Sequence, residues 1–213
     1  MTPNAKPIVF VVDDDISVRE SLGQLVTFGG WQSEVFPSAQ DFLSRPRPTV
    51  PNCLLLDVTL PGLSGLALQK QLGERGDIPI IFMTGHGDVR TAVQAMKAGA
   101  FEFLTKPFTG DQMLEAIRSA LEQSRGAAHY KAEVRKLGER YELLTPRERD
   151  VMTQVVSGLL NKQVGWELGI SESTVKAHRG QVMRKMKADS LAELVRMSAR
   201  LGLPPATQSA TAA

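Results

Sequence analysis

The sequence of 213 residues has little that would tie it to a membrane or to an oxidising compartment. Cys53 is its only cysteine, so no internal disulfide can form and a reducing compartment suits the chain best. No apolar run approaches the roughly 20 residues that a membrane helix needs, and residues 1–6 lack the apolar core of a secretory signal. We therefore expect a cytoplasmic protein in which Cys53 is a small buried hydrophobe inside a strand.

The chain also has no large excess of positive or negative charge, since its net charge is only +2. The balance differs along the chain: residues 1–121 carry 10 Lys and Arg against 13 Asp and Glu, whereas residues 122–213 carry 15 against 10. This length favours two domains, and the opposite charge balance suggests that the two halves meet different partners. The basic excess of the second half is by itself weak evidence for nucleic-acid binding.

Short apolar runs bounded by turn residues define the first half of the chain. The clearest run ends at Asp57 and a Pro-Gly turn soon follows, which is typical of a strand buried on both faces of a parallel sheet. Segments with helical apolar spacing separate the runs, so the pattern predicts a doubly wound five-stranded α/β domain with right-handed crossovers. Strands are expected at residues 8–12, 31–36, 54–57, 78–83 and 101–104.

Polar side chains stand where four of these strands end. The carboxyl ends of parallel strands share one edge of the sheet, so residues far apart in sequence are expected to meet there. Taken singly, each has an ordinary explanation, since paired aspartates form turns and a lysine at a strand end is usually solvated. Their joint placement instead predicts a site at which Asp57 accepts a phosphoryl group. The residues are Asp13, Asp14, Asp57, Thr84 and Lys106.

The residue types in this group favour a magnesium ion. Three neighbouring carboxylates are costly unless a cation compensates them, and hard oxygen ligands suit Mg²⁺. We expect Asp14 and Asp57 to bind it directly, the Thr59 carbonyl to contribute, and Asp13 to act through water. The ion would neutralise phosphoryl oxygens so that the Asp57 carboxylate can attack phosphorus. The lysine and the threonine would each bind a further phosphoryl oxygen.

Four segments within residues 7–121 resemble the receiver domain of bacterial two-component response regulators: VVDDD, LLLDVTLPGLSG, MTGHGD and AGAFEFLTKPF. The resemblance implies a flavodoxin-like fold, phosphoryl transfer from a sensor histidine kinase to Asp57, and no turnover of a separate substrate. It also implies a switch in which the Thr84 hydroxyl moves to the phosphoryl group and the ring of Phe103 follows inward. Phenylalanine replaces the tyrosine often found there, and the alternative is that Phe103 is a plain core aromatic.

The apolar spacing changes after Leu121, and residues 122–142 are expected to form a helical linker. The new 4-3-4-3 spacing is that of a coiled coil, although it covers only about two heptads. Its register differs from that of the preceding helix, and Gly126 lies between the two. The linker then either pairs with another copy of the chain or packs on the second domain, with a frayed helical tether as the plain alternative. The apolar positions are Tyr130, Val134, Leu137, Tyr141 and Leu144.

Residues 143–203 carry the start and stop signals of four short helices. Thr145 and Glu148 form a capping box at the first helix, and Ser190 with Glu193 repeats the box at the fourth. A turn of about four residues that contains glycine separates the second helix from the third. This small all-α arrangement predicts a helix-turn-helix domain whose third helix enters the major groove of DNA.

The third of these helices is basic, since residues 171–187 hold six Lys, Arg and His side chains against one glutamate. A basic helix is usually a solvated face, but the tight turn and the cap before it favour DNA binding. LTPRERDVM, NKQVGWELGISESTVKAH and DSLAELV resemble the LuxR-type output domain, and with the receiver they resemble the FixJ-type subclass. Gly165 stands where alanine is common, which is expected to loosen its helix.

The LuxR-type resemblance assigns DNA contacts to two helices. Gly180 lies where a basic contact residue often sits, which leaves base recognition to Lys176, Ala177 and Arg179. Thr174 and Lys185 are expected to contact phosphates, which fix the position of the domain rather than its sequence preference. The expected DNA-contacting residues are Asn161, Lys162, Ser173, Thr174, Lys176, Ala177, His178, Arg179 and Lys185.

Together these features predict a transcription regulator, and specifically an activator, whose DNA binding depends on phosphorylation of Asp57. The expected partners are promoter DNA, a sensor histidine kinase, RNA polymerase and a second copy of the chain, which the LuxR-type resemblance places at the fourth helix of the output domain. The domains are expected to be a receiver at 1–121, a helical linker at 122–142, a helix-turn-helix domain at 143–203 and a disordered tail at 204–213.

Two other functions stay open from the sequence. Asp13-Asp14-Asp15 superficially resembles the nucleophile motif of haloacid-dehalogenase-type phosphatases, with Lys106 in the lysine role. That family needs a further acidic pair after the lysine, which Asp111 alone does not supply. The second alternative is a phosphate-indifferent DNA-binding protein with a vestigial receiver, and it is disfavoured because no expected site position is missing.

Overall fold

The computed structural model describes residues 6–46, 48–73, 78–85 and 89–204, which divide into two compact units between His129 and Tyr130. Residues 86–88 of the MTGHGD segment, and the expected disordered tail apart from Pro204, lie outside the described residues. No helix within the described ranges combines the length and the apolar character required to cross a membrane.

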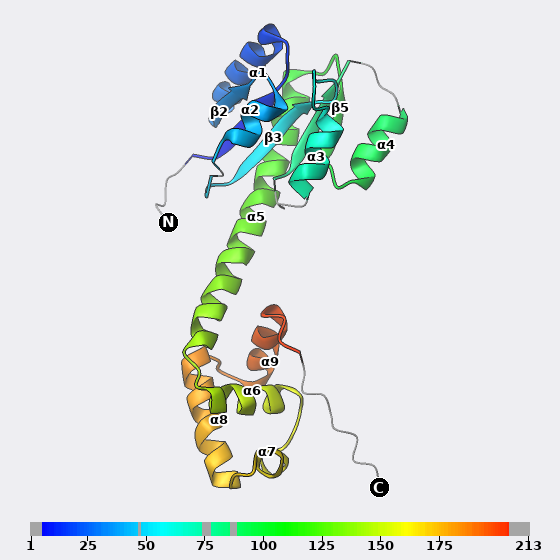
Figure 1. Ribbon diagram of the computed structural model, residues 1–213. Coiled ribbons are helices and arrows are strands. Elements are labelled where there is room, and N and C mark those ends of the chain that lie inside the picture. The colour runs from blue at the N-terminus through cyan, green and yellow to red at the C-terminus, as the bar shows by residue number, and fades with distance from the viewer. Residues whose placement is uncertain (1–5, 47, 74–77, 86–88, 205–213) are drawn as a thin grey trace. The chain divides into compact units, whose positions relative to one another are not determined.

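The first unit is a five-stranded parallel sheet with helices on both faces, as the sequence predicted (Figure 1). The strand order β2-β1-β3-β4-β5 places β1 beside β3, where the winding of the chain reverses direction. In such sheets the ligand site lies outside the carboxyl ends of the strands at this reversal. The elements are β1 Ile8–Val12, α1 Ile16–Phe28, β2 Gln32–Phe36, α2 Ala39–Ser44, β3 Asn52–Asp57, α3 Gly65–Gly73, β4 Ile80–Thr84, α4 Val89–Lys97 and β5 Glu102–Thr105.

The central strands are apolar at every position because both of their faces are covered. Strands β1, β3 and β4 are buried along their whole length, whereas the edge strands β2 and β5 are partly exposed. Phe10 and Phe82 face α2, α3 and α4, and Val11 and Ile81 face α1 and α5 (Gly110–Glu142) on the other side. Cys53 is fully buried in β3, as expected, and this burial raises the pKa of its thiol.

Helix α5 is longer than the sequence indicated. The change of apolar register near Gly126 led us to separate a linker from the preceding helix, but α5 is one helix of 33 residues from Gly110 to Glu142. One exposed glycine costs only about 1 kcal/mol in a helix interior. The flanking residues are good helix formers, so the helix continues and only its apolar stripe changes direction.

Within residues 130–204, the second unit contains four short helices besides the end of α5, as the sequence predicted. The Thr145–Glu148 capping box is present at α6. At α9 the box is only half formed: the Ser190 hydroxyl accepts from the Glu193 N–H, but the Glu193 carboxylate accepts from Asp189 N–H instead. The helices are α6 Pro146–Val156, α7 Asn161–Leu168, α8 Glu172–Met186 and α9 Leu191–Arg200.

The end of α5 is part of the apolar core of this second unit. Leu137 and Leu144 are buried in a cluster with residues of α6, α8 and α9, and Tyr141 packs against the same cluster. Arg140 Nη1 also donates to the carbonyl of Met186 at the end of α8, at 3.2 Å. The later part of the 4-3 apolar repeat, Leu137, Tyr141 and Leu144, therefore packs inside this unit, which was one of the two partners considered from the sequence, whereas Tyr130 is exposed.

Candidate functional site

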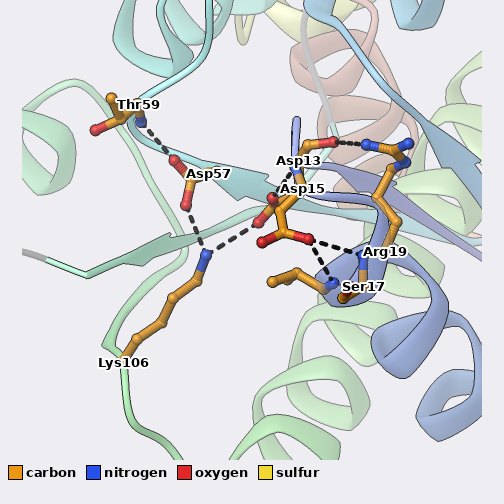
Figure 2. Close-up of polar contacts among 8 residues, drawn as sticks. Asp13, Asp15, Ser17, Arg19, Asp57, Thr59 and Lys106 are labelled. Carbon is orange, nitrogen blue, oxygen red and sulfur yellow. Dashed lines mark hydrogen bonds and ion pairs between the residues drawn. The ribbon is translucent and has the colours of Figure 1, made fainter.

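Two aspartates and one lysine meet at the carboxyl edge of the sheet (Figure 2). Asp57 ends β3, and Asp13 directly follows the neighbouring strand β1. Lys106, which follows β5, reaches back so that its Nζ lies 2.8 Å from Asp57 Oδ1 and 3.0 Å from Asp13 Oδ2. The expected convergence of residues far apart in sequence is therefore present for these three.

The backbone around Asp57 is fixed closely. Asp57 Oδ2 accepts a hydrogen bond from the Thr59 N–H at 2.6 Å, which holds the carboxylate over the loop after β3. Gly65, in the LSG segment at the start of α3, lies against this loop, and a Cβ there would come within 2.3 Å of the Asp57 carbonyl oxygen. Any larger residue at that position would displace the strand end that carries Asp57.

Asp13 is held by two residues whose roles the sequence reading missed. Its Oδ1 accepts from the Asp15 N–H at 2.9 Å, and Arg19 Nη1 donates to its main-chain carbonyl at 2.7 Å (Figure 2). Asp15 caps α1 by accepting from the N–H of Ser17. An aspartate just before a helical run is a cap signal, so Asp15 could have been assigned from the sequence, whereas the Arg19 contact required the folded loop.

Lys106 supplies the positive charge that faces Asp13 and Asp57. Burial by itself would lower the pKa of Lys106, but its hydrogen bonds to Asp57 and Asp13 and the two negative charges outweigh burial and raise that pKa. Asp13 and Asp57 are only 1% and 7% exposed, so the lysine compensates two nearly buried carboxylates. The Lys106-Pro107 peptide bond is cis.

The other expected residues of this site are Thr84, Asp14 and Phe103. Thr84 is buried at the end of β4, and its carbonyl accepts from the Lys106 N–H at 2.7 Å. Asp14 is exposed beside Asp13. Phe103 lies half-buried in β5, with its ring 6.3 Å from that of Phe82, and packs against the core.

The donor set fits a magnesium ion. Lys106 shows that a cation is accommodated between Asp13 and Asp57, and carboxylate and carbonyl oxygens are the ligands that Mg²⁺ prefers. Within the described ranges, no group of three or more His, Cys, Asp or Glu side chains is arranged to hold a metal. Asp14, Asp57 and the Thr59 carbonyl would hold the ion, Asp13 would act through water, and further waters would complete the shell, since Mg²⁺ usually keeps several waters.

The second unit presents two helices joined by a tight turn. Gly169 ends α7 with a φ of 64°, a conformation that favours glycine, and the Ser171 hydroxyl caps α8 by accepting from the Thr174 N–H. Gly165, which was expected to loosen α7, has a steric role in the structure. A Cβ there would lie 2.7 Å from the Ile170 carbonyl oxygen, so glycine allows the turn to approach the helix.

The expected DNA-contacting residues of α7 and α8 differ in exposure and in their partners. Lys176 is exposed and forms an ion pair with Glu172 at 3.1 Å, and Arg179 Nη1 donates to Asn161 Oδ1 at 3.1 Å. The Ser171 hydroxyl lies 2.8 Å from the hydroxyls of both Ser173 and Thr174. The exposed members are Lys162, Ser173, Thr174, Lys176 and Ala177, and the half-buried members are Asn161, His178, Arg179 and Lys185.

Lys185 has a partner that the sequence did not reveal. Its Nζ lies 2.6 Å from Oε2 of Glu148, the capping-box residue of α6, which is 5% exposed. Burial by itself would raise the pKa of Glu148, but the hydrogen bonds from Lys185 and Thr145 outweigh burial and lower that pKa. Lys185 therefore holds α8 to α6, and a phosphate contact would have to compete with this pair.

Comparisons with known proteins match both units of the chain. Residues 9–118 match the family model described as response regulator receiver domain, and residues 142–198 match bacterial regulatory proteins of the luxR family. The two matches fall on the units that carry the Asp57 site and the helix pair α7–α8.

Relatives share this arrangement over most of the chain. Nodulation protein W of Bradyrhizobium diazoefficiens is 50% identical over 201 residues, which cover 94% of this chain and 88% of the relative. Transcriptional regulatory protein FixJ of the same organism is 42% identical over 196 residues, covering 92% and 96%. The solved structure of response regulator StyR is 45% identical, has a TM-score of 0.79, and covers 92% of this chain and 100% of that one.

Proposed function

Because the chain belongs to the FixJ-type two-component response regulators, which join a receiver domain to a LuxR-type DNA-binding domain, we propose that phosphorylation of Asp57 controls its binding to promoter DNA. Such proteins regulate transcription and do not turn over a separate substrate, and a DNA-binding response regulator implies promoter DNA and a cognate histidine kinase as partners.

The observation that carries the proposal is the contact of Lys106 with both Asp57 and Asp13. A carboxylate at the end of β3, 2.8 Å from a lysine ammonium, has beside it a group that can bind a phosphoryl oxygen once the phosphoryl group is attached. Asp13, Asp14, Asp57 and the Thr59 carbonyl would hold Mg²⁺, which neutralises charge on the incoming phosphoryl group. The Asp57 carboxylate would attack phosphorus and form an O–P bond, while the bond between phosphorus and the donor atom breaks and its electron pair leaves with the donor.

A phosphoryl group on Asp57 would compete for the lysine that now bridges the two aspartates. The Thr84 hydroxyl, at the end of the next strand, would bind another phosphoryl oxygen, and Phe103 would move inward with it. Phe103 packs against the core through contacts that include Phe82, so its movement would change the surface beside β5.

The output step would be dimerisation on DNA followed by activation of transcription through RNA polymerase. Leu191 and Val195, one turn apart on α9, are exposed apolar side chains, and this helix is where we place the contact between two copies. Two linked helix-turn-helix units engage two half-sites at once, which raises affinity without new contacts in either half-site.

Two experiments test the proposal. Mass mapping of the chain after treatment with acetyl phosphate and Mg²⁺ should place a hydroxylamine-labile phosphoryl group on the peptide with Asp57, and none on it in Asp57→Asn. Selection from a random duplex library should then yield a paired half-site only with the phosphodonor. Phosphate mapped elsewhere, or the same sites selected without the donor, would refute it. Turnover of free phosphomonoesters that is lost in Asp13→Asn would favour the phosphatase instead.

A further inference from the structure

Asn161 and Arg179 connect the two helices of the helix-turn-helix pair. Asn161 is the first residue of α7, and Arg179 lies in the middle of α8, 18 positions later. Arg179 Nη1 donates to Asn161 Oδ1 at 3.1 Å, and both side chains are half-buried. Within the described part of the chain, this is the only hydrogen bond or ion pair found for the Arg179 guanidinium.

The position of Arg179 on α8 explains its half-buried state. Val175 and Val182 mark the inward face of the helix, and Arg179 lies four residues from one and three from the other. Residues three apart are also neighbours, so Arg179 borders the exposed side that carries Lys176. An arginine at such a border can lay its stem along the protein and extend its charged end toward a groove.

The chemistry of the partner distinguishes Arg179 from the other cations assigned to DNA on α8. Lys176 and Lys185 face carboxylates, Glu172 and Glu148, which offset their charge. Arg179 faces an uncharged amide oxygen, which orients the guanidinium and leaves its charge uncompensated. A guanidinium has five N–H donors in a rigid fork, so one bond to an amide leaves a two-donor edge available.

We propose that Asn161 is a positioning residue that orients Arg179 for bidentate recognition of one guanine in each DNA half-site. Arginine with guanine O6 and N7 is the commonest base-specific contact in the major groove, and it requires two parallel donors. The amide bond removes part of the rotational freedom that the arginine would otherwise lose on binding. This inference rests on the proposed DNA-binding function. It adds that Arg179 contacts the base and that Asn161 orients Arg179.

The proposal predicts a pattern across variants of the full chain, each used with acetyl phosphate and Mg²⁺ to select from a random duplex library. Arg179→Ala should lose the guanine preference at one position of each half-site. Asn161→Ala should weaken that same preference by roughly tenfold, a part of the discrimination that a bidentate pair provides. Asn161→Asp keeps an acceptor at the same place and should retain the preference, although its added charge lowers affinity for all sequences.

Lys162→Ala is the matched control, since Lys162 follows Asn161 on the same helix and is exposed. It should weaken binding to all sequences alike and reduce the dependence of affinity on salt. Thermal unfolding of Asn161→Ala should match that of the parent chain, because alanine is a good helix former and the side chain is half-buried.

Three outcomes would overturn the proposal. If Asn161→Ala weakens all sequences alike and flattens the salt dependence as Lys162→Ala does, Asn161 is a phosphate contact. If the base preferences of Asn161→Ala equal those of the parent chain, its bond to Arg179 serves only to join the helices. If the parent chain selects no preferred sequence, the proposed sequence-specific DNA binding is refuted. This result would be known before any variant is compared with the parent chain.

Discussion

The ion pair between Glu148 and Lys185 gives the sharpest stability prediction. Replacing Glu148 by glutamine keeps the size of the side chain and an oxygen that can accept the Thr145 N–H, but it removes the charge that faces Lys185 at 2.6 Å. The two side chains are 6% and 27% exposed, so water screens the pair only partly. A hydrogen bond between charged groups contributes about 1.5–3 kcal/mol, and we expect Glu148→Gln to cost about that amount at pH 7.

The same pair predicts a larger loss when the lysine is removed. Lys185→Met leaves a nearly buried carboxylate without its cation, and orphaning a buried charge costs about 3 kcal/mol or more. The double variant should be more stable than Lys185→Met alone, because it removes the orphaned charge. Glu172→Gln is the matched control: its ion pair with Lys176 is exposed on both sides and should contribute less than about 0.5 kcal/mol.

The pH dependence follows from the direction of the pKa shift. The pKa of Glu148 is lower in the folded chain than its ordinary value of 4.5, so the folded state binds the proton less readily than the unfolded state. Its contribution is therefore complete above pH 4.5 and is lost as the pH falls below that value toward the folded-state pKa. The difference in stability between the parent chain and Glu148→Gln should be full at pH 7 and smaller at pH 4.

Hydrogen exchange of the full chain, followed by mass spectrometry on peptides from α6 and α8, measures the free energy of opening for these helices. Rates would be corrected for the intrinsic effect of pH on exchange. An equal cost of Glu148→Gln at pH 4 and at pH 7 would show that the charge of Glu148 is not what stabilises the contact. An equal cost of Glu172→Gln and Glu148→Gln would likewise contradict the prediction.

Three further changes follow from particular contacts. Gly165→Ala should destabilise the second unit by about 1 kcal/mol or more, despite the better helix propensity of alanine, because its Cβ would lie 2.7 Å from the Ile170 carbonyl; a higher melting temperature would contradict this. Leu137→Ala should lower the opening free energy of α8 by about 2–4 kcal/mol in hydrogen exchange, while the exposed control Arg135→Ala should not. Lys106→Met should slow phosphorylation by acetyl phosphate by about a hundredfold, as measured by mass spectrometry. An unchanged rate would show that Lys106 does not stabilise the phosphoryl group during its transfer.

The sequence predicted those features that depend on local pattern. The buried strands β1, β3 and β4 are continuous apolar runs because helices cover both faces, and that composition is visible without a structure. The convergence of Asp13, Asp57 and Lys106 followed from the expectation of a parallel sheet, since parallel strands direct their carboxyl ends to one edge.

Features that depend on contacts between distant residues could not be predicted. Nothing near Glu148 indicates that Lys185, 37 positions away, is its partner, and nothing near Gly165 reveals the approach of the Ile170 carbonyl. The continuity of α5 across Gly126 was missed for another reason. A change of apolar register was used to separate a helical linker from the preceding helix, whereas it occurs within one continuous helix: residues up to Leu121 pack in one apolar cluster and Leu137 packs in another.

The central claim is that the charge state of Asp57 controls DNA binding, and one ratio tests it most directly. The affinity of the full chain for a selected paired half-site, measured by fluorescence anisotropy with and without acetyl phosphate and Mg²⁺, should rise about a hundredfold on phosphorylation because both half-sites are then engaged at once. In Asp57→Asn the donor should leave the affinity unchanged. An equal rise in both proteins would contradict the account.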